Sequence, residues 1–312
     1  MNIPRFSRLR RALRRAIPSL DRYHRPRLPF PRSHAARKSS DPFISGDTFR
    51  SICAHVFDET DIGFNPQAIR PGDLVFANGS MLKQFFAYAH PHITAAYVLV
   101  SHNTDHAIPG AYVGLLEDPK ILAWFTQNLD RTHAKLRPIP IGLANAHWKH
   151  GDTEILRRLL PVSDVKAAPY QHLAYLNFSR KRQERSRTEV WDLFRDAEFC
   201  HVAEGRSYPD YLRDMQASRF VISPPGNGLD CHRHWEALLL GSIPVMKHSS
   251  IDPLFDGLPV VLVHDWREVT RKMLLARDQD LRARMLERQR LFAQFWLDRI
   301  AQVQAAVRNA GQ

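Results

Sequence analysis

The chain has 312 residues, 44% of them hydrophobic, and a formal net charge of +12. This length is sufficient for two domains that each bury a core of their own. Three cysteines, Cys53, Cys200 and Cys231, are too few and too scattered for a disulfide framework or a zinc site, which excludes a disulfide-rich secreted protein. No apolar run reaches the length of a signal peptide or a membrane span, so we expect a cytoplasmic protein.

Positive charge is concentrated at the N-terminus. Residues 1–38 hold eleven arginines and one lysine against one aspartate, which accounts for eleven of the twelve net positive charges. Apolar residues occur there at three- and four-residue steps, at Phe6, Leu9, Leu13, Ile17 and Leu20. Residues 1–40 are therefore predicted to be a basic arm, either an amphipathic helix on an anionic membrane surface, at its inner face, or a disordered segment. The rest of the chain is nearly neutral, so we expect no nucleic-acid partner.

Residues 41–168 are predicted to form a first α/β domain, on the acceptor side, entered through a linker over 39–70. The apolar runs predict strands at 74–77, 95–100, 121–125 and 137–142, and a helix at 81–90. His102 and Asp105 follow the second of these strands, where ligands collect in open α/β sheets. They are candidates for a general base or for acceptor binding; the alternative is a loop held by Asx-type hydrogen bonds.

Residues 169–275 are predicted to form a second α/β domain that binds a nucleotide. A strand at 173–178 leads into a cationic segment and a helix over 185–194. Arg180 and Arg185 are the preferred cations for a diphosphate leaving group, because positive charge at a strand end stabilises the charge that develops there. The alternative is a solvated, basic start of a helix.

The segment after the apolar strand at 220–222 predicts an anion-binding loop. Two prolines end the strand, and Gly226, Asn227 and Gly228 allow the backbone to approach a ligand. Asp230 is predicted to cap a helix that ends at Gly241, followed by strands at 243–245 and 258–263. The N–H groups of such a helix start favour an anion.

Two charged residues of that helix share one face. Arg233 lies in the first turn, and Glu236 lies one turn deeper. The arginine is expected to contact phosphate and the carboxylate to accept hydrogen bonds from ribose hydroxyls. The alternative is a solvated cap in which Arg233 and Glu236 form an ordinary ion pair.

The C-terminal part, 276–312, is predicted to be amphipathic helices that pack across the two domains. The apolar stripe comprises Met285, Phe292, Trp296, Ile300, Val303 and Val307. The acidic pair Asp278 and Asp280 precedes this stripe and is interpreted as a helix cap, so no metal site is expected.

The sequence resembles the exostosin-like glycosyltransferases over roughly residues 70–270. The most specific segment is PPGNGLDCHRHWEAL at 224–238 followed by GSIPV at 241–245, and the segments 101–105, 124–128 and 138–143 fit the N-terminal half of that family. The resemblance implies two Rossmann-like domains facing a cleft (the GT-B type), a sugar nucleotide held mainly by the second domain, an inverting reaction and no obligatory metal.

These features predict a glycosyltransferase that moves a sugar from a nucleotide-sugar donor to an acceptor hydroxyl, in the synthesis of cell-surface glycan or polysaccharide. The expected partners are the sugar nucleotide and a glycan or glycolipid acceptor, with no cofactor beyond the donor. The alternative is a nucleotide-binding or membrane-surface protein without transfer activity, which turnover of the donor would distinguish.

Overall fold

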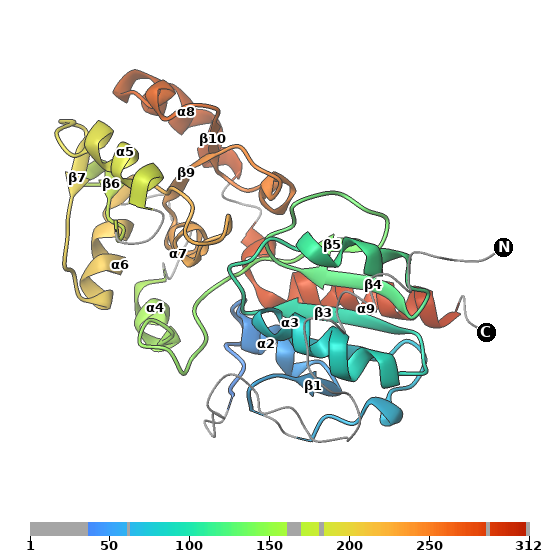
Figure 1. Cartoon of the computed structure of the whole chain (residues 1–312). Helices are drawn as coiled ribbons and strands as arrows, with labels where there is room; N and C mark the ends of the chain where they lie inside the picture. The colour runs from blue at the N-terminus through green and yellow to red at the C-terminus, as the bar shows by residue number, and fades with distance from the viewer. Residues whose placement is uncertain (1–36, 61–62, 161–169, 181–183, 285–287, 310–312) are drawn as a thin grey trace.

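The protein is an α/β protein with two five-stranded parallel sheets. The computed structural model describes residues 37–60, 63–160, 170–180, 184–284 and 288–309, so the predicted arm lies outside the described residues, apart from its last few positions. The strand orders are β1-β2-β3-β4-β5 and β10-β9-β8-β6-β7. Figure 1 shows the two sheets in separate halves of the chain. The predicted α/β class is therefore confirmed.

The first sheet contains the four predicted strands and one that the sequence did not reveal. Its strands are β1 (His55–Phe57), β2 (Leu74–Asn78), β3 (Tyr97–His102), β4 (Ile121–Thr126) and β5 (Leu136–Pro138). All six residues of β3 are buried, as expected of a parallel strand that is covered on both faces. The carboxyl ends of β3, β4 and β5 point toward the second half of the chain (Figure 1).

The predicted linker over 39–70 is wrong, because this segment is folded into the first half. It contains α2 (Gly46–Ser51), β1 and the 3₁₀ turn η1 (Pro66–Ala68). Ser45 caps α2 by accepting a hydrogen bond from the Thr48 main-chain N–H, and it also forms a bridge with Leu143 in the loop after β5. The segment therefore belongs to the domain and not to a connection.

The helix predicted over 81–90 is irregular. It consists of the turns η2 (Gly79–Met81), α3 (Leu82–Gln84), the π-helical η3 (Phe85–Ala89) and η4 (His90–His92). Phe85 and Phe86 are both buried within an aromatic cluster, and the widened turn at η3 accommodates two adjacent bulky rings on the core side. A longer 3₁₀ segment, η5 (Gly110–Glu117), connects β3 to β4.

The second sheet consists of β6 (His172–Leu176), β7 (Cys200–Val202), β8 (Ser218–Ile222), β9 (Ile243–Lys247) and β10 (Val261–Val263). Its helices are α5 (Glu184–Phe194), α6 (Tyr208–Gln216) and α7 (His232–Leu240), and α4 (Thr153–Leu159) precedes it. The short turns η6 (Asp252–Phe255) and η7 (Trp266–Glu268) follow β9 and β10.

The strand order reverses between β6 and β8. From β6 the chain adds β7 on one side, and it then returns to the other side to add β8, β9 and β10 in succession. In open α/β sheets, ligands bind outside the carboxyl ends of the strands at such a reversal. The residues that follow β6 and β8 are therefore the first place to look for a site.

The helix after the glycine-rich loop begins one residue later than predicted. Its N-cap is Cys231, so the assignment of Asp230 as the cap is wrong, and the reason lies in the contacts of the Asp230 carboxylate described below. The predicted stop is confirmed, because Gly241 caps the helix in the left-handed conformation, with φ of 86°.

Two further helices, α8 (Arg271–Arg284) and α9 (Ala293–Asn309), follow β10, with the turn η8 (Arg288–Leu291) before α9. Asp278 lies inside α8, where its buried carboxylate pairs with Arg219 of β8, so the interpretation of this residue as a cap at a helix start is wrong. Met285 lies outside the described residues.

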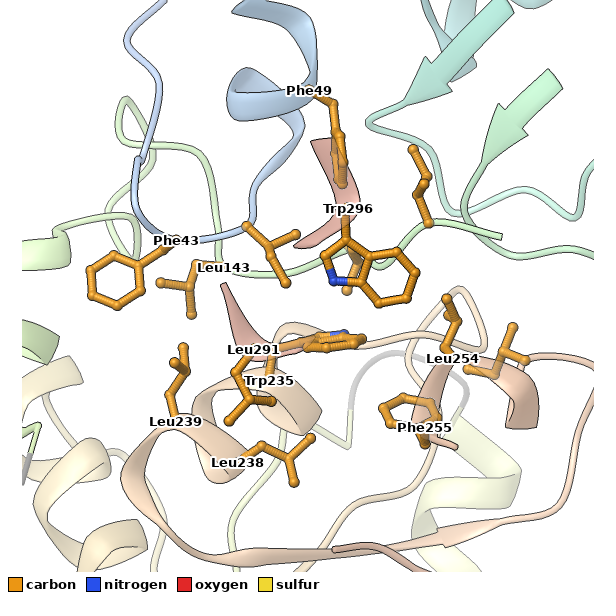
Figure 2. Close-up of a cluster of buried hydrophobic side chains, with 14 of the residues drawn as sticks. Phe43, Phe49, Leu143, Trp235, Leu238, Leu239, Leu254, Phe255, Leu291 and Trp296 are labelled. Carbon is orange, nitrogen blue, oxygen red and sulfur yellow. The ribbon is translucent and has the colours of Figure 1, made fainter. Parts of the chain in front are cut away.

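One apolar cluster connects the two halves. The Trp235 ring of α7 contacts the Trp296 ring of α9 at 6.5 Å between centroids and stacks on Phe255 at 5.3 Å. Figure 2 shows these side chains together with Phe43 and Leu143 of the first half. Helix α9 also contacts β4, so it touches elements of both halves. Among the described residues, no helix has both the length and the hydropathy needed to cross a membrane.

Candidate functional site

Two buried arginines meet at the reversal of the second sheet. Arg233 of α7 donates from Nε to the Ser223 hydroxyl at 2.9 Å and from Nη2 to the Pro224 carbonyl. Arg187 of α5 donates to the carbonyls of Ser179 at 2.7 Å and Pro225 at 2.8 Å. The loops that follow β6 and β8 thus hold both guanidinium groups.

The same aromatic ring packs against both cations. The guanidinium carbons of Arg187 and Arg233 lie 5.6 Å and 5.4 Å from the centroid of the Phe178 ring, which follows β6. Among the described residues, Arg233 has no carboxylate within ion-pair distance. A buried guanidinium without a paired carboxylate is unfavourable unless an anion neutralises it, and Arg187 adds a second guanidinium beside the same ring. The arrangement is therefore suited to a phosphorylated ligand.

Arg187 was missed in the sequence, although a signal was present. It lies in phase with Val190, Trp191 and Phe194, which form the buried face of α5, so it is a charged residue on an apolar stripe. The predicted Arg180 is exposed, pairs with Glu204 at 2.9 Å and lies 4.8 Å from the Trp191 ring. The Arg185 side chain lies outside the described part of the chain.

The glycine-rich loop folds back between the arginines and the first half. The Gly226 N–H donates to the Gly228 carbonyl at 2.9 Å, and a Cβ atom at Gly226 would lie 3.4 Å from the Arg187 guanidinium. A Cβ atom at Gly228 would lie 2.5 Å from the Asn128 amide nitrogen, so a side chain at this position would displace Asn128, which accepts a hydrogen bond from the Asp230 N–H. The exposed Asn227 donates to the Asp105 carboxylate at 3.0 Å. The structure thus brings two predicted residues, Asp105 and Asn227, into contact.

The Asp230 carboxylate connects the two halves. It accepts hydrogen bonds from the Ile141 main-chain N–H at 2.7 Å and from the Trp235 indole N–H at 2.9 Å, and the Asp230 N–H donates to Asn128 Oδ1 at 3.0 Å. These donors explain why it does not cap α7. His232 strengthens the same contact, because its Nδ1 lies 2.7 Å from the Gly142 carbonyl oxygen.

Glu236 is held by two tyrosines of α6. The hydroxyls of Tyr208 and Tyr211 donate to its two carboxylate oxygens at 3.0 Å and 2.9 Å. Burial, reinforced by the charge of Glu236, raises the pKa of both tyrosines, which therefore remain protonated donors. Arg233 and Glu236 are both buried and have separate partners, so the alternative of a solvated ion pair is wrong.

His102 is a buried, neutral histidine. The Asn103 main-chain N–H donates to its Nδ1 at 2.8 Å, so the proton lies on Nε2, which donates to the Pro140 carbonyl at 3.0 Å. Burial lowers the pKa of His102 to about 4. Because main-chain groups occupy both ring nitrogens, a role as general base would require the ring to leave its partners.

The part of the chain that the structure describes contains no cluster of three or more histidine, cysteine, aspartate or glutamate side chains arranged to hold a metal ion.

No protein-family model matches the chain, and no curated protein matches its sequence. Among solved structures, it is similar to an α1,3-fucosyltransferase at 11% identity and a TM-score of 0.40, over 73% of this chain and 70% of that one. A GtfA/B complex matches at 12% identity and a TM-score of 0.40, over 76% of this chain and 58% of that one. The pneumococcal O-GlcNAc transferase GtfA in complex with UDP and GlcNAc matches at 11% identity and a TM-score of 0.33, over 77% of this chain and 53% of that one. Similarity at this level assigns no function.

Proposed function

We propose that the protein is a glycosyltransferase that moves a sugar from a nucleotide-sugar donor to an acceptor hydroxyl. The observation that carries this proposal is the pair Arg187 and Arg233 on the Phe178 ring, at the carboxyl ends of β6 and β8. This is the position at which an open α/β sheet binds its ligand, and the chemistry of the pair favours a diphosphate.

The arginines supply the electrostatic part of the reaction. When the bond between the sugar and the diphosphate breaks, negative charge develops on the leaving oxygen. Two guanidinium groups that are already fixed by main-chain carbonyls stabilise this charge without further rearrangement. They would do the work that a divalent cation does in metal-dependent transferases, so the proposed reaction is metal-independent.

The nucleoside part is assigned to Glu236. Each of its carboxylate oxygens accepts one tyrosine hydroxyl and retains capacity for a second hydrogen bond, which suits the hydroxyl pair of a ribose. Glu236 lies one turn from Arg233 on α7, so a diphosphate at the arginine would place the ribose on the same helix face. Gly226 and Gly228 add no side chains to the loop that precedes this helix.

The remaining features of the proposal concern the acceptor. We assign the acceptor to the first half, with the Asp105–Asn227 contact at the boundary between the halves. An inverting reaction requires a base on the acceptor hydroxyl there. The basic arm would direct the enzyme to acceptors on an anionic membrane, such as a glycolipid or a nascent cell-surface glycan.

A ligand screen tests the proposal. UDP- and GDP-linked sugars are added to the purified protein, and a donor at 100 times its dissociation constant should stabilise it by about 2.7 kcal/mol. Glu236→Gln should weaken UDP or GDP more than inorganic pyrophosphate, because pyrophosphate has no ribose. Equal weakening of all three would contradict the ribose assignment, and a donor that binds without turnover would indicate a non-catalytic nucleotide-binding protein.

A further inference from the structure

A buried carboxylate in the first half has no role in the site described so far. Asp47 lies in the first turn of α2, and its side chain is 1% exposed. Among the described residues, neither carboxylate oxygen has a hydrogen-bond partner. The nearest basic groups are the Arg37 guanidinium at 3.7 Å and the His147 ring at 3.3 Å. A buried carboxylate without a hydrogen bond is rare in folded proteins and suggests a functional reason.

The partner of this carboxylate is a partly exposed histidine. His147 Nδ1 lies 3.3 Å from Asp47 Oδ2, and Arg37 Nη1 lies 2.6 Å from His147 Nε2 and 2.9 Å from Nδ1. An arginine only donates hydrogen bonds, so one of the two ring nitrogens presents a lone pair to it and the ring is neutral. Arg37 is itself held by an ion pair with Glu59. A neutral imidazole beside a buried carboxylate is suited to act as a general base, because the carboxylate stabilises the charge that the ring acquires with a proton.

The loop that carries His147 contacts the nucleotide-binding half at both ends. At its start the Gly142 carbonyl meets His232 of α7, and near its end the His150 ring packs 5.3 Å from the ring of Tyr208, which holds Glu236. Trp148 is 63% exposed, and its ring lies 5.8 Å from that of His147. The base and a flat apolar surface therefore lie side by side on a loop that is fixed against the donor site.

We propose that His147, Asp47 and Trp148 form the acceptor subsite, an inference that rests on the proposed function. The acceptor hydroxyl replaces Arg37 Nη1 at His147 Nε2, and its sugar ring packs on Trp148. As the acceptor oxygen bonds to the anomeric carbon, its proton passes to Nε2, and the bond from that carbon to the diphosphate breaks with its electron pair leaving on the nucleoside diphosphate. His147 is the catalytic residue, and Asp47 acts through it, because its carboxylate stabilises the positive charge that the ring acquires with the proton.

The pH dependence of transfer separates this role from a structural one. His147 must be neutral to accept a proton, so kcat/KM falls as the pH drops through its pKa. Burial and the Arg37 charge lower that pKa, and Asp47 opposes them. Arg37→Gln should therefore move the acidic limb to higher pH, and Asp47→Asn should move it to lower pH. A residue that only supports the fold would change the height of the profile but not its position.

The experiment uses the full chain, UDP- and GDP-linked sugars as donors and p-nitrophenyl glycosides as acceptors. His147→Gln should lower transfer by about 100-fold or more, while calorimetry shows unchanged binding of UDP or GDP. His133→Gln, a histidine on the loop before β5 that lies near Glu117, is the matched control. Trp148→Ala should raise the KM for the acceptor while kcat is retained. Trp148→Phe should bring the KM most of the way back to that of the parent.

The outcomes distinguish this inference from the proposed function. If the parent transfers sugar and His147→Gln transfers it as fast, the subsite is wrong while the glycosyltransferase remains. Unshifted acidic limbs in both Arg37→Gln and Asp47→Asn would also overturn the subsite. If the parent binds no nucleotide and turns over no donor, the proposed function fails, and the subsite fails with it.

Discussion

Asp230→Ala should destabilise the protein strongly, because the Asp230 carboxylate is the acceptor for donors from both halves. The substitution leaves the Ile141 main-chain N–H and the Trp235 indole N–H buried without an acceptor. Each orphaned buried donor costs about 1–3 kcal/mol, so the expected loss is about 2–6 kcal/mol. Asp230→Asn keeps the shape and one acceptor oxygen, and an intermediate loss is expected.

Urea unfolding of the parent and the two variants measures these losses. Asp256→Ala is the control, since Asp256 is exposed, and its expected effect is within about 0.5 kcal/mol. If Asp230→Ala unfolds within 1 kcal/mol of the parent at an unchanged m-value, the contact between the halves does not have the strength that its geometry indicates.

Three further predictions concern pH, metal and membrane. Between pH 6.5 and about 4 the unfolded chain binds a proton that buried His102 does not, so the folding stability of the parent falls by up to about 3 kcal/mol as the pH drops through this range. His102→Gln should reduce this dependence of stability on pH, measured by urea unfolding. An unchanged slope of stability against pH would refute the prediction. Sugar transfer should persist in excess chelator because Arg187 and Arg233 supply the positive charge, and loss of activity that manganese restores would contradict this. Vesicles with anionic lipid should retain the full chain, with a binding free energy of about 1 kcal/mol per basic residue near the surface, and should not retain a chain that lacks residues 1–36. The truncation ends before Arg37 so that the acceptor subsite stays intact. Equal retention by neutral vesicles would show that charge is not the cause.

The sequence predicted most of the strands because parallel strands buried on both faces are short continuous apolar runs. Val75, Val98 and Val221 lie in such runs and are fully buried. The edge strands β1 and β7 escaped prediction because neither is an apolar run: in β1 the middle residue alone is buried, and in β7 no residue is buried. The edge strands β5 and β10 also have three residues, but they lie in longer apolar segments of the sequence.

The site was predictable where one helix presents it and unpredictable where two elements meet. Arg233 and Glu236 follow from the spacing along α7, but the tyrosines that hold Glu236 come from α6, and Asp230 meets Ile141 at a sequence separation of 89. Contacts of this kind leave no local pattern. The buried carboxylate of Asp47 was missed for the same reason, since its partner His147 is in another loop and Asp47 itself lay in the expected linker.

Calorimetric titration of UDP and GDP into the parent, Arg233→Gln and Arg187→Gln tests the central claim most directly. The account predicts that the parent binds at least one nucleotide and that each variant, shown by its melting transition to be folded, binds it about 10- to 100-fold more weakly, as expected for the loss of a charge-assisted hydrogen bond. Arg267→Gln, which removes an exposed arginine paired with Asp265, should bind like the parent. Parent-like affinity in both buried-arginine variants would contradict the claim that this pair holds the diphosphate.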